Sequence, residues 1–346
     1  FNNNCFNIWS LKLLKFKLHD FRNKRYYILM EPAYLFIGST HYITHVFMLN
    51  KDLYSGDIDG NIIKWNFESR RCEIKWKAHD KCILSIQFLK SKNHLVTHGR
   101  DGYLKFWLKS DNKFIEINRM ESNPYSFCQM ALHRSSNNDY EFISFDLNDE
   151  DHTIEIVEYP KDIITYNLCV KPPKSHSIKS YGMVMSISIL NNKVMFVGYE
   201  SGYVIMFKEF QYHSAIKVAD CIICMAVSEN RLLIIGTPDN ELIVIEIDSN
   251  FISMNERKKI LLKNPGISSV VFRQDGKIFA TAGWDGLIRV FTSKGLKQLV
   301  ALKWNVDHCQ TDKTNRHLAV AFTAENYLIS GSDDKIICFW DVFRNK

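Results

Sequence analysis

A pattern that recurs about every 46 residues constrains the fold more than any other feature of this 346-residue chain. Each copy has a short apolar run, a small residue, a turn that contains Asp or a small residue, and alternating apolar residues that end on an aromatic. The clearest copies occupy residues 54–65, 97–107, 281–291 and 330–340. In all four, six positions separate the turn Asp from the aromatic residue. The chain is therefore built from repeats.

Three weaker copies keep the same spacing, from Ser201 to Phe207, from Asp239 to Ile245 and from Asp151 to Val157. The seven anchors then stand at positions 59, 101, 151, 201, 239, 285 and 334. Their spacing is close to the length of a WD40 blade, about 40–45 residues, plus modest insertions. We predict an all-β fold, a seven-bladed WD40 β-propeller over residues 32–346.

The residues in each copy explain why a ring of blades forms. Asp-Gly supplies the positive φ angles of a tight hairpin, so each turn joins two antiparallel strands. Alternating segments such as residues 104–107 and 288–291 present apolar side chains to both faces of a sheet. One blade cannot bury both faces, whereas a closed ring can.

Both ends of the chain bear on ring closure. The last repeat reaches only its third strand before the sequence stops, so we expect residues 33–37 to supply its outer strand. Residues 1–31 are then a separate N-terminal extension outside the ring, basic and aromatic. Within it, residues 7–18 suit an amphipathic element that binds a membrane surface or a partner; a partial sequence or gene-model artefact is the open alternative.

Charge is concentrated in that extension. Six basic and two acidic residues give residues 1–31 a net charge of +4, which leaves about +2 of the total +6 for residues 32–346. A protein that binds nucleic acid through phosphate contacts normally carries a basic stripe, and we find none in residues 32–346. No run approaches the about 18 uncharged apolar residues of a membrane helix. We expect neither direct nucleic-acid binding nor a membrane span.

The nine cysteines indicate a reducing compartment, because they are odd in number and scattered, and no signal peptide precedes them. Cys221 and Cys224 form a CxxC in an apolar run that we assign to the first strand of blade five. Residues three apart on a strand face opposite sides, so these thiols are expected to diverge rather than bind zinc.

The sequence contains no motif for catalysis. Phosphate loops, dinucleotide-binding glycines, nucleophile elbows, zinc-protease motifs and kinase signatures are all absent. We expect no enzyme activity, no cofactor and no metal site.

A set that resembles catalytic residues has a structural interpretation. His79, Thr97, Asp101 and Trp107 match the hydrogen-bonded His–Ser/Thr–Asp–Trp tetrad of WD40 blades. In blade seven Ser330, Asp334 and Trp340 fit the same pattern, with His308 as the candidate fourth member. We assign both sets to fold stability.

Binding residues are better sought at the hairpin tips. The residue before each turn anchor is Ile58, Arg100, Glu200, Pro238, Trp284 or Asp333. Trp and Arg are enriched at binding hot spots, so Trp284 and Arg100 lead the protein-binding candidates; the alternative is that Trp284 packs on a neighbouring loop and Arg100 pairs with an acid. Residues 158–182, with Pro172-Pro173 and several lysines, are interpreted as a long exposed interblade loop.

Blade six carries a specific family resemblance. Asn264-Pro265-Gly266-Ile267, the run from Ile278 to Asp285 and Ile288-Arg289-Val290-Phe291 resemble the WD-repeat proteins associated with the ASTRA complex, whose animal counterpart is G-protein β-subunit-like. Further similar stretches are Gly99-Arg100-Asp101, the run from Val197 to Gly202 and the run from Gly331 to Trp340.

This resemblance implies a nuclear or cytoplasmic scaffold without catalysis. Members of the family associate with RuvB-like AAA+ ATPases and with the co-chaperone that matures PI3-kinase-related kinases. In fungi the assembly includes a large pseudokinase shared with histone acetyltransferase complexes, which links it to chromatin. The resemblance therefore implies a client kinase or pseudokinase as a partner.

Two other binding functions remain open. One is a G-protein β-like signalling scaffold. The β subunits of heterotrimeric G proteins share the ring but begin with a coiled-coil helix, whereas residues 1–31 hold no sustained heptads. A substrate receptor of a ubiquitin ligase is the other, and co-purification with a cullin adaptor distinguishes it.

Overall fold

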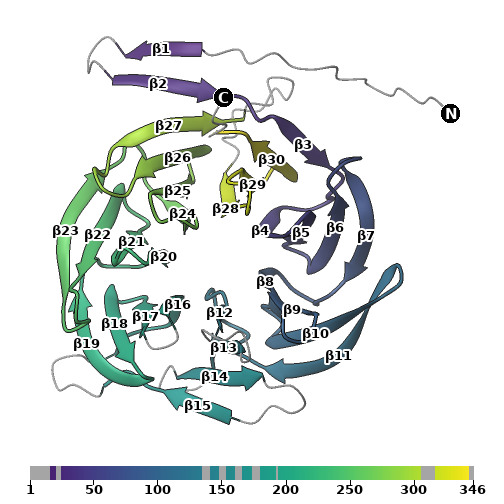
Figure 1. Cartoon of the computed structure of the whole chain (residues 1–346), viewed down its shortest axis with the longest axis horizontal. Helices are drawn as coiled ribbons and strands as arrows, with labels where there is room; N and C mark the ends of the chain where they lie inside the picture. The colour runs from purple at the N-terminus through teal and green to yellow at the C-terminus, as the bar shows by residue number, and fades with distance from the viewer. Residues whose placement is uncertain are drawn as a thin grey trace.

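The computed structural model of the chain describes residues 16–20, 25–134, 141–147, 153–159, 166–173, 180–191, 194–304 and 316–342. These residues form seven β-sheets that stand as blades around a common centre (Figure 1). The first strand of each blade lies nearest the centre and the fourth lies at the periphery. The predicted all-β, seven-bladed propeller is confirmed.

Within each blade the strands are antiparallel neighbours in chain order, apart from the two blades that recruit N-terminal strands. Blade one contains β4 (Ile43–Leu49), β5 (Asp52–Asp57), β6 (Asn61–Asn66) and β7 (Arg71–Lys77). Blade two contains β8 (Ile83–Leu89), β9 (His94–Gly99), β10 (Tyr103–Ser110) and β11 (Lys113–Glu121). Blade three contains β12 (Ala131–Arg134), β13 (Glu141–Asp146), β14 (Ile154–Tyr159) and β15 (Tyr166–Val170).

The remaining blades follow the same order. Blade four contains β16 (Val184–Asn191), β17 (Val194–Tyr199), β18 (Tyr203–Lys208) and β19 (Gln211–Lys217). Blade five contains β20 (Cys224–Val227), β21 (Leu232–Gly236), β22 (Glu241–Ile247) and β23 (Met254–Leu261). Blade six contains β24 (Ile267–Phe272), β25 (Ile278–Gly283), β26 (Leu287–Thr292) and β27 (Gln298–Lys303), and blade seven contains β28 (His317–Phe322), β29 (Leu328–Ser332), β30 (Ile336–Trp340) and β3 (Tyr34–Ile37).

The core is divided among the interfaces between blades. Seven clusters of buried apolar side chains are present in the described residues, and each joins two neighbouring blades. The cluster between blades one and two, for example, holds Tyr54 and Ile62 against Ile86 and Trp107. Each sheet is thus covered on both faces, which is the physical reason why the repeats form a ring.

The hairpin between the second and third strands depends on backbone conformation. Gly60 and Gly102 follow the turn Asp of blades one and two with φ of +85° and +86°, where glycine is free of the Cβ penalty. A Cβ on Gly60 would lie 2.1 Å from the carbonyl oxygen of His79. The glycine is therefore needed for both the turn and the close approach of the next loop.

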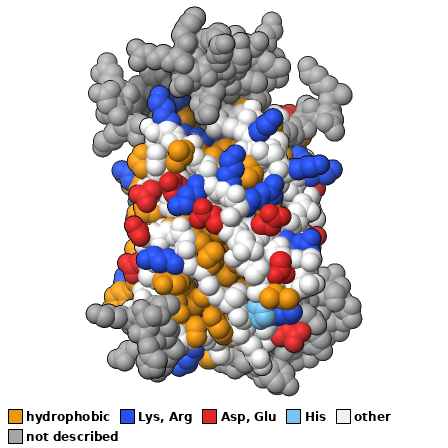
Figure 2. Space-filling view, turned by 90° about the vertical axis from the view of Figure 1, so that its left-hand side faces the viewer, with side chains coloured by type: hydrophobic (Ala, Val, Ile, Leu, Met, Phe, Trp, Pro, Cys, Tyr) orange, Lys and Arg blue, Asp and Glu red, His pale blue; other side chains and the backbone are white. Residues whose placement is uncertain are grey.

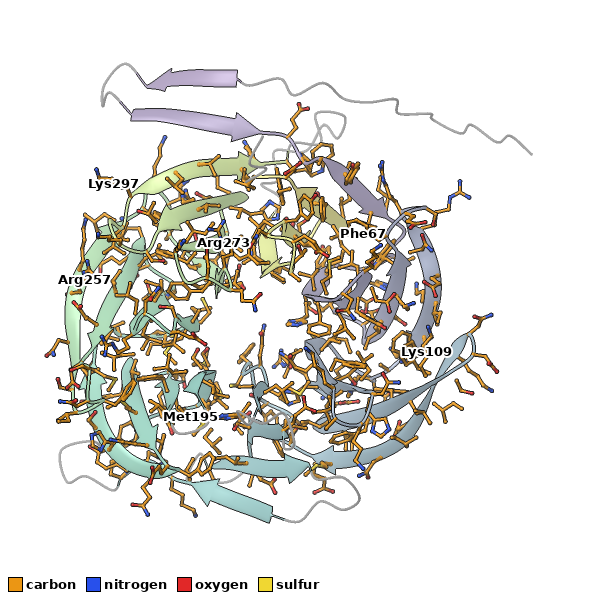
Figure 3. All side chains as sticks on the ribbon, viewed as in Figure 1. Phe67, Lys109, Met195, Arg257, Arg273 and Lys297 are labelled. Carbon is orange, nitrogen blue, oxygen red and sulfur yellow. The ribbon has the colours of Figure 1, made fainter. Side chains whose placement is uncertain are left out.

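The ring is closed by an N-terminal strand, as predicted. Strand β3 pairs antiparallel with β30, with Tyr34 opposite Phe339 and Ile37 opposite Ile336. Phe67, labelled in Figure 3 where the last and first blades meet, lies 5.2 Å from the Phe339 ring centroid to centroid. The closure is non-covalent and rests on this pairing together with aromatic packing.

Residues before β3 contribute a hairpin outside the ring (Figure 1). Strand β1 (Phe16–Asp20) pairs antiparallel with β2 (Arg25–Met30). Strand β2 lies parallel to β27, with Leu29 opposite Ala301, and so extends blade six at its outer edge. Of the segment 7–18 singled out above, residues 7–15 lie outside the described residues and the rest belongs to β1.

The interpretation of residues 158–182 as one long loop was wrong. Strand β14 extends to Tyr159, and Tyr166–Val170 forms β15, the fourth strand of blade three, with Val170 opposite Ile154. The lysines and Pro172-Pro173 are typical of an exposed loop, and the strand between them is only five residues long. Residues 160–165 and 174–179 and the anchor Asp151 lie outside the described residues.

Candidate protein-interaction site

The structure brings the four predicted residues of blade two together. His79 Nδ1 lies 2.8 Å from Asp101 Oδ1, and His79 Nε2 lies 2.7 Å from Thr97 Oγ1. The indole N–H of Trp107 donates to Thr97 Oγ1 over 2.9 Å. The chain of contacts runs from β10 through β9 to the loop before β8, so it ties three parts of the blade together.

Every polar side chain of this set has a partner within it. The Trp107 N–H can only donate, so the Thr97 hydroxyl accepts it. Both ring nitrogens of His79 are occupied, Nδ1 by Asp101 and Nε2 by Thr97. Burial by itself raises the pKa of Asp101, but the hydrogen bond and charge of His79, the Asp80 N–H and Lys105 outweigh it and lower the pKa. Every member is occupied by an internal partner, which favours a structural role.

Two further blades repeat the Trp–hydroxyl contact. Trp340 Nε1 donates to Ser330 Oγ over 3.0 Å, and Trp65 Nε1 donates to Ser55 Oγ over 2.8 Å. In blade seven the Asp334 carboxylate accepts from the Ser332 hydroxyl and from the Ile336 N–H. His308 lies outside the described residues.

Blade one places its turn carboxylate differently from the repeat pattern. Asp57, two residues before the anchor Asp59, accepts from the backbone N–H groups of Asp59 and Asn61 over 3.0 and 2.8 Å. The Asp59 side chain is half exposed and lies 3.1 Å from His41. Asp57 is thus the carboxylate that holds this turn.

Blade six replaces the histidine of the tetrad with two other donors. Asp285 accepts from both terminal nitrogens of Arg289 and, over 3.0 Å, from the amide of Asn264. Although burial opposes the charge, these donors lower the pKa of Asp285. A bidentate arginine–carboxylate contact thus takes the place of the histidine–carboxylate contact of blade two.

The CxxC is not arranged as a metal site. Only Cys224 lies in β20; Cys221 precedes the strand. Cys221 Sγ donates to the Ile222 carbonyl, and Cys224 Sγ donates across the blade interface to the Ile267 carbonyl. Among the described residues, no three His, Cys, Asp or Glu side chains are grouped to hold a metal ion. The part of the chain that the structure describes also contains no helix long and apolar enough to cross a membrane.

The hairpin tips form one face of the ring. In five blades the tip residue donates its N–H to the carbonyl of the residue just before the first strand of the same blade, at 2.9 to 3.1 Å; these pairs are Ile58–Tyr42, Arg100–Cys82, Glu200–Met183, Trp284–Gly266 and Asp333–Arg316. The tips and the loops leading into the inner strands therefore share one face, which we call the hairpin face.

Three of the predicted tip residues have internal contacts. Trp284 packs so closely on Gly266 that a Cβ there would lie 2.1 Å from the indole. The Glu200 carboxylate accepts from the Met183 N–H, and the Asp333 carboxylate accepts from the Arg316 N–H over 2.8 Å. These side chains stabilise neighbouring loops, and Trp284 still leaves 37% of its surface exposed.

Ile58 and Arg100 differ from those three. Ile58 is 44% exposed. The Arg100 guanidinium lies 4.3 Å over the ring centroid of Phe127, from the loop between blades two and three. Burial raises the pKa of the Cys82 thiol, and the charges of Arg100 and Asp57 act on it in opposite directions. The Arg100 backbone N–H donates to the Cys82 carbonyl over 2.9 Å, so Cys82 lies directly beneath that tip.

Sequence reasoning missed two exposed aromatic residues on the loop that Arg100 contacts. Tyr125 and Phe127 are 67% and 50% exposed, although large aromatics are usually buried at least in part. The segment from Ser122 to Cys128 lies outside the repeat pattern and contains none of the seven turn anchors. The alternation Tyr125-Ser126-Phe127 between two blades was the available signal.

The periphery of the ring has a different character. Figure 2 shows one side of the molecule, where acidic and basic side chains are interspersed. Pairs such as Lys259–Glu241 at 3.1 Å neutralise one another on the outer strands. A surface of mixed sign does not attract a polyanion strongly.

Known proteins resemble the chain over most of its length. The sequence matches the ASTRA-associated protein 1 family over residues 33–318 and a WD domain, G-beta repeat, over residues 311–341. The ASTRA-associated protein 1 of Aspergillus flavus is 26% identical, with 81% of this chain and 82% of the relative covered. That of Schizosaccharomyces pombe is 25% identical, with 91% and 100% covered.

An animal relative and a solved structure add to this likeness. The guanine nucleotide-binding protein subunit beta-like protein 1 of Mus musculus is 26% identical, with 85% of this chain and 88% of the relative covered. The crystal structure of the Cps50 (Swd1) β-propeller domain from Myceliophteria thermophila superposes with a TM-score of 0.70 at 15% identity, with 90% and 100% covered. At that identity the superposition shows the fold alone.

Proposed function

Because this chain belongs to the ASTRA-associated protein 1 family, we propose that it is a non-catalytic WD40 scaffold subunit of an ASTRA-type assembly. In this role it supports the maturation of PI3-kinase-related kinases and contributes to chromatin remodelling and transcription regulation. The proposed partners are RuvB-like AAA+ ATPases, the kinase co-chaperone, and a client kinase or pseudokinase. We propose the nucleus, and also the cytoplasm, as its location.

The observation that carries the proposal is the family match over residues 33–318, which includes six of the seven blades. The name that the two fungal relatives share, ASTRA-associated protein 1, describes association with ASTRA. A repeat ring suits such a role because its rigid frame presents many loops at fixed positions.

The internal chemistry of the ring supports a scaffold rather than an enzyme. The His79–Asp101 pair resembles a general-base arrangement. Its histidine, however, is almost fully buried, and each ring nitrogen lies within hydrogen-bond distance of a partner in the same blade. A general base must reach a substrate proton, and this imidazole has both nitrogens occupied.

Rapid depletion of the chain in its own cells tests the proposed function. The protein levels of PI3-kinase-related kinases are followed by quantitative mass spectrometry, with their transcripts measured alongside. We expect the kinases to decline over several of their own half-lives while transcripts stay constant, because unassembled kinases are degraded. Kinase levels that stay constant after complete depletion contradict the maturation role.

A further inference from the structure

The loop between blades two and three is built to display aromatic side chains. From Tyr125 to Cys128, exposed aromatics alternate with buried residues: Tyr125 and Phe127 are at least half exposed, whereas Ser126 and Cys128 are fully buried. Asn123, before them, is 7% exposed. The loop thus points two large apolar side chains at solvent in a regular way.

A buried carboxylate fixes this loop in place. The Asp146 carboxylate at the end of β13 accepts from Ser126 Oγ over 2.7 Å and from Asn123 Nδ2 over 3.0 Å. The Ser126 hydroxyl also accepts the Cys128 N–H over 2.9 Å, and Asn123 Oδ1 accepts the Tyr125 N–H. Because the backbone on both sides of each aromatic is held, little conformational entropy is left to lose when a partner binds.

Arg100 stands over this loop with an uncompensated charge. Its guanidinium stacks on Phe127, and among the described residues it forms no ion pair with a carboxylate. Stacking orients the planar donor fork and leaves its N–H groups available. Such an arginine is prepared for a bidentate contact with a carboxylate.

We propose that Arg100, Tyr125 and Phe127, with Ile58 at the neighbouring tip, form a docking surface for a partner-protein segment that presents a carboxylate beside an apolar side chain. We call it the arginine–aromatic surface. The inference deepens the proposed scaffold function and rests on it, since it assigns the contact to blades one to three of the hairpin face.

Charge complementarity selects this occupant. One arginine among apolar side chains matches one carboxylate next to an apolar group. A nucleic acid would need several cations along a path. The adjacent tip instead carries two acids, of which Asp57 holds the turn and Asp59 pairs with His41. Tyr, Phe and Arg at the centre of a contact also match the composition of hot spots.

Site-specific photo-crosslinking in cells tests the proposal. Benzoylphenylalanine replaces Tyr125 in the full chain, and the adduct is identified by mass spectrometry after purification of the intact assembly. The control position is Ile252, which is 60% exposed in the turn between β22 and β23. We expect a crosslink from position 125 to a partner segment in which Asp, Glu or a C-terminus adjoins an apolar residue, and no such crosslink from position 252.

A second variant tests the charge. Arg100→Glu in the crosslinking protein is expected to reduce the adduct by about tenfold or more, the loss typical of a hot-spot contact. Arg257→Glu, on the outer strand β23, is the matched control and is expected to leave it unchanged. Unchanged melting temperatures show that both variants are folded.

Several outcomes overturn the proposal. These are an intact assembly with no adduct at position 125, an adduct insensitive to Arg100→Glu, an adduct to nucleic acid, and an adduct to a second copy of this chain. The failures of the two proposals are distinguishable. An assembly without ASTRA-type subunits but with an Arg100-dependent adduct contradicts the scaffold role alone, and an ASTRA-type assembly without the adduct contradicts the surface alone.

Discussion

Trp107 donates its indole N–H to the hydroxyl of Thr97 over 2.9 Å, ten residues away across neighbouring strands. In blade six the same two positions hold Phe291 and Thr281. Phenylalanine has no N–H, and in the described part of the chain the buried Thr281 hydroxyl has no hydrogen-bond partner. Threonine at the equivalent position thus has its hydroxyl hydrogen-bonded in blade two but not in blade six.

Substituting valine for each of these two threonines should change the free energy of unfolding differently at the two sites. Thr97→Val leaves the Trp107 N–H and His79 Nε2 without their partner and is expected to cost about 1–3 kcal/mol. Thr281→Val removes an unsatisfied hydroxyl and is expected to be neutral or stabilising. Urea unfolding of both variants measures the difference, and an equal cost at the two sites contradicts the hydrogen-bond assignment.

The two turn acids of blades one and two should also differ, although the repeat aligns them. Asp101→Ala leaves His79 Nδ1 and the Asp80 N–H unpaired and is expected to destabilise by about 1–3 kcal/mol. Asp59→Ala removes a half-exposed carboxylate and is expected to change stability by less than about 0.5 kcal/mol. Thermal melting of the two variants side by side is the check; a similar loss at Asp59 shows that this residue also supports its blade.

Stability should fall on mild acidification because of three buried histidines. Burial lowers the pKa of His45 to about 4, of His98 to about 3 and of His317 to about 4. In the unfolded chain they bind protons near pH 6.5, so their contribution is complete above that pH and is lost as the pH falls toward 4. Three protons correspond to a slope of about 4 kcal/mol per pH unit well below pH 6.5.

The unfolding free energy measured between pH 7.5 and 5 tests this slope. His98→Gln is expected to reduce it by about 1.4 kcal/mol per pH unit. His213→Gln, at an exposed position of β19, is the matched control. The lowered pKa values of Asp101 and Asp285 add stability that is complete above their ordinary value of 3.8 and is lost only below it, outside this window. A slope that His98→Gln does not alter contradicts the account.

Ring closure should depend on β3 and not on the hairpin before it. Phe36 is fully buried against Trp65, with ring centroids 5.8 Å apart, so Phe36→Ala is expected to cost about 3–5 kcal/mol. Deletion of residues 1–31 leaves this strand in place and is expected to preserve the melting temperature. Differential scanning calorimetry compares the two, and a large loss on deletion of residues 1–31 shows that the β1–β2 hairpin supports blade six.

The repeat made the blades and their closure predictable because turn chemistry and alternation are local signals. Asp101-Gly102 marks its hairpin from sequence alone, and the spacing to Trp107 follows from strand length. The repeat position does not predict the role of a residue where a blade holds its turn with a different side chain. In blade one, for example, Asp57 accepts the turn N–H groups instead of Asp59. The display of Tyr125 and Phe127 was not predictable, since it depends on Asp146, a residue from the next blade that lies about 20 positions away.

Affinity purification of the tagged chain at native level, with mass spectrometry of its partners, tests the central claim most directly. A family scaffold should recover RuvB-like ATPases together with a PI3-kinase-related kinase or pseudokinase, in amounts comparable to the chain itself. Recovery of a cullin adaptor, of a Gγ-like peptide or of no stoichiometric partner contradicts the scaffold role.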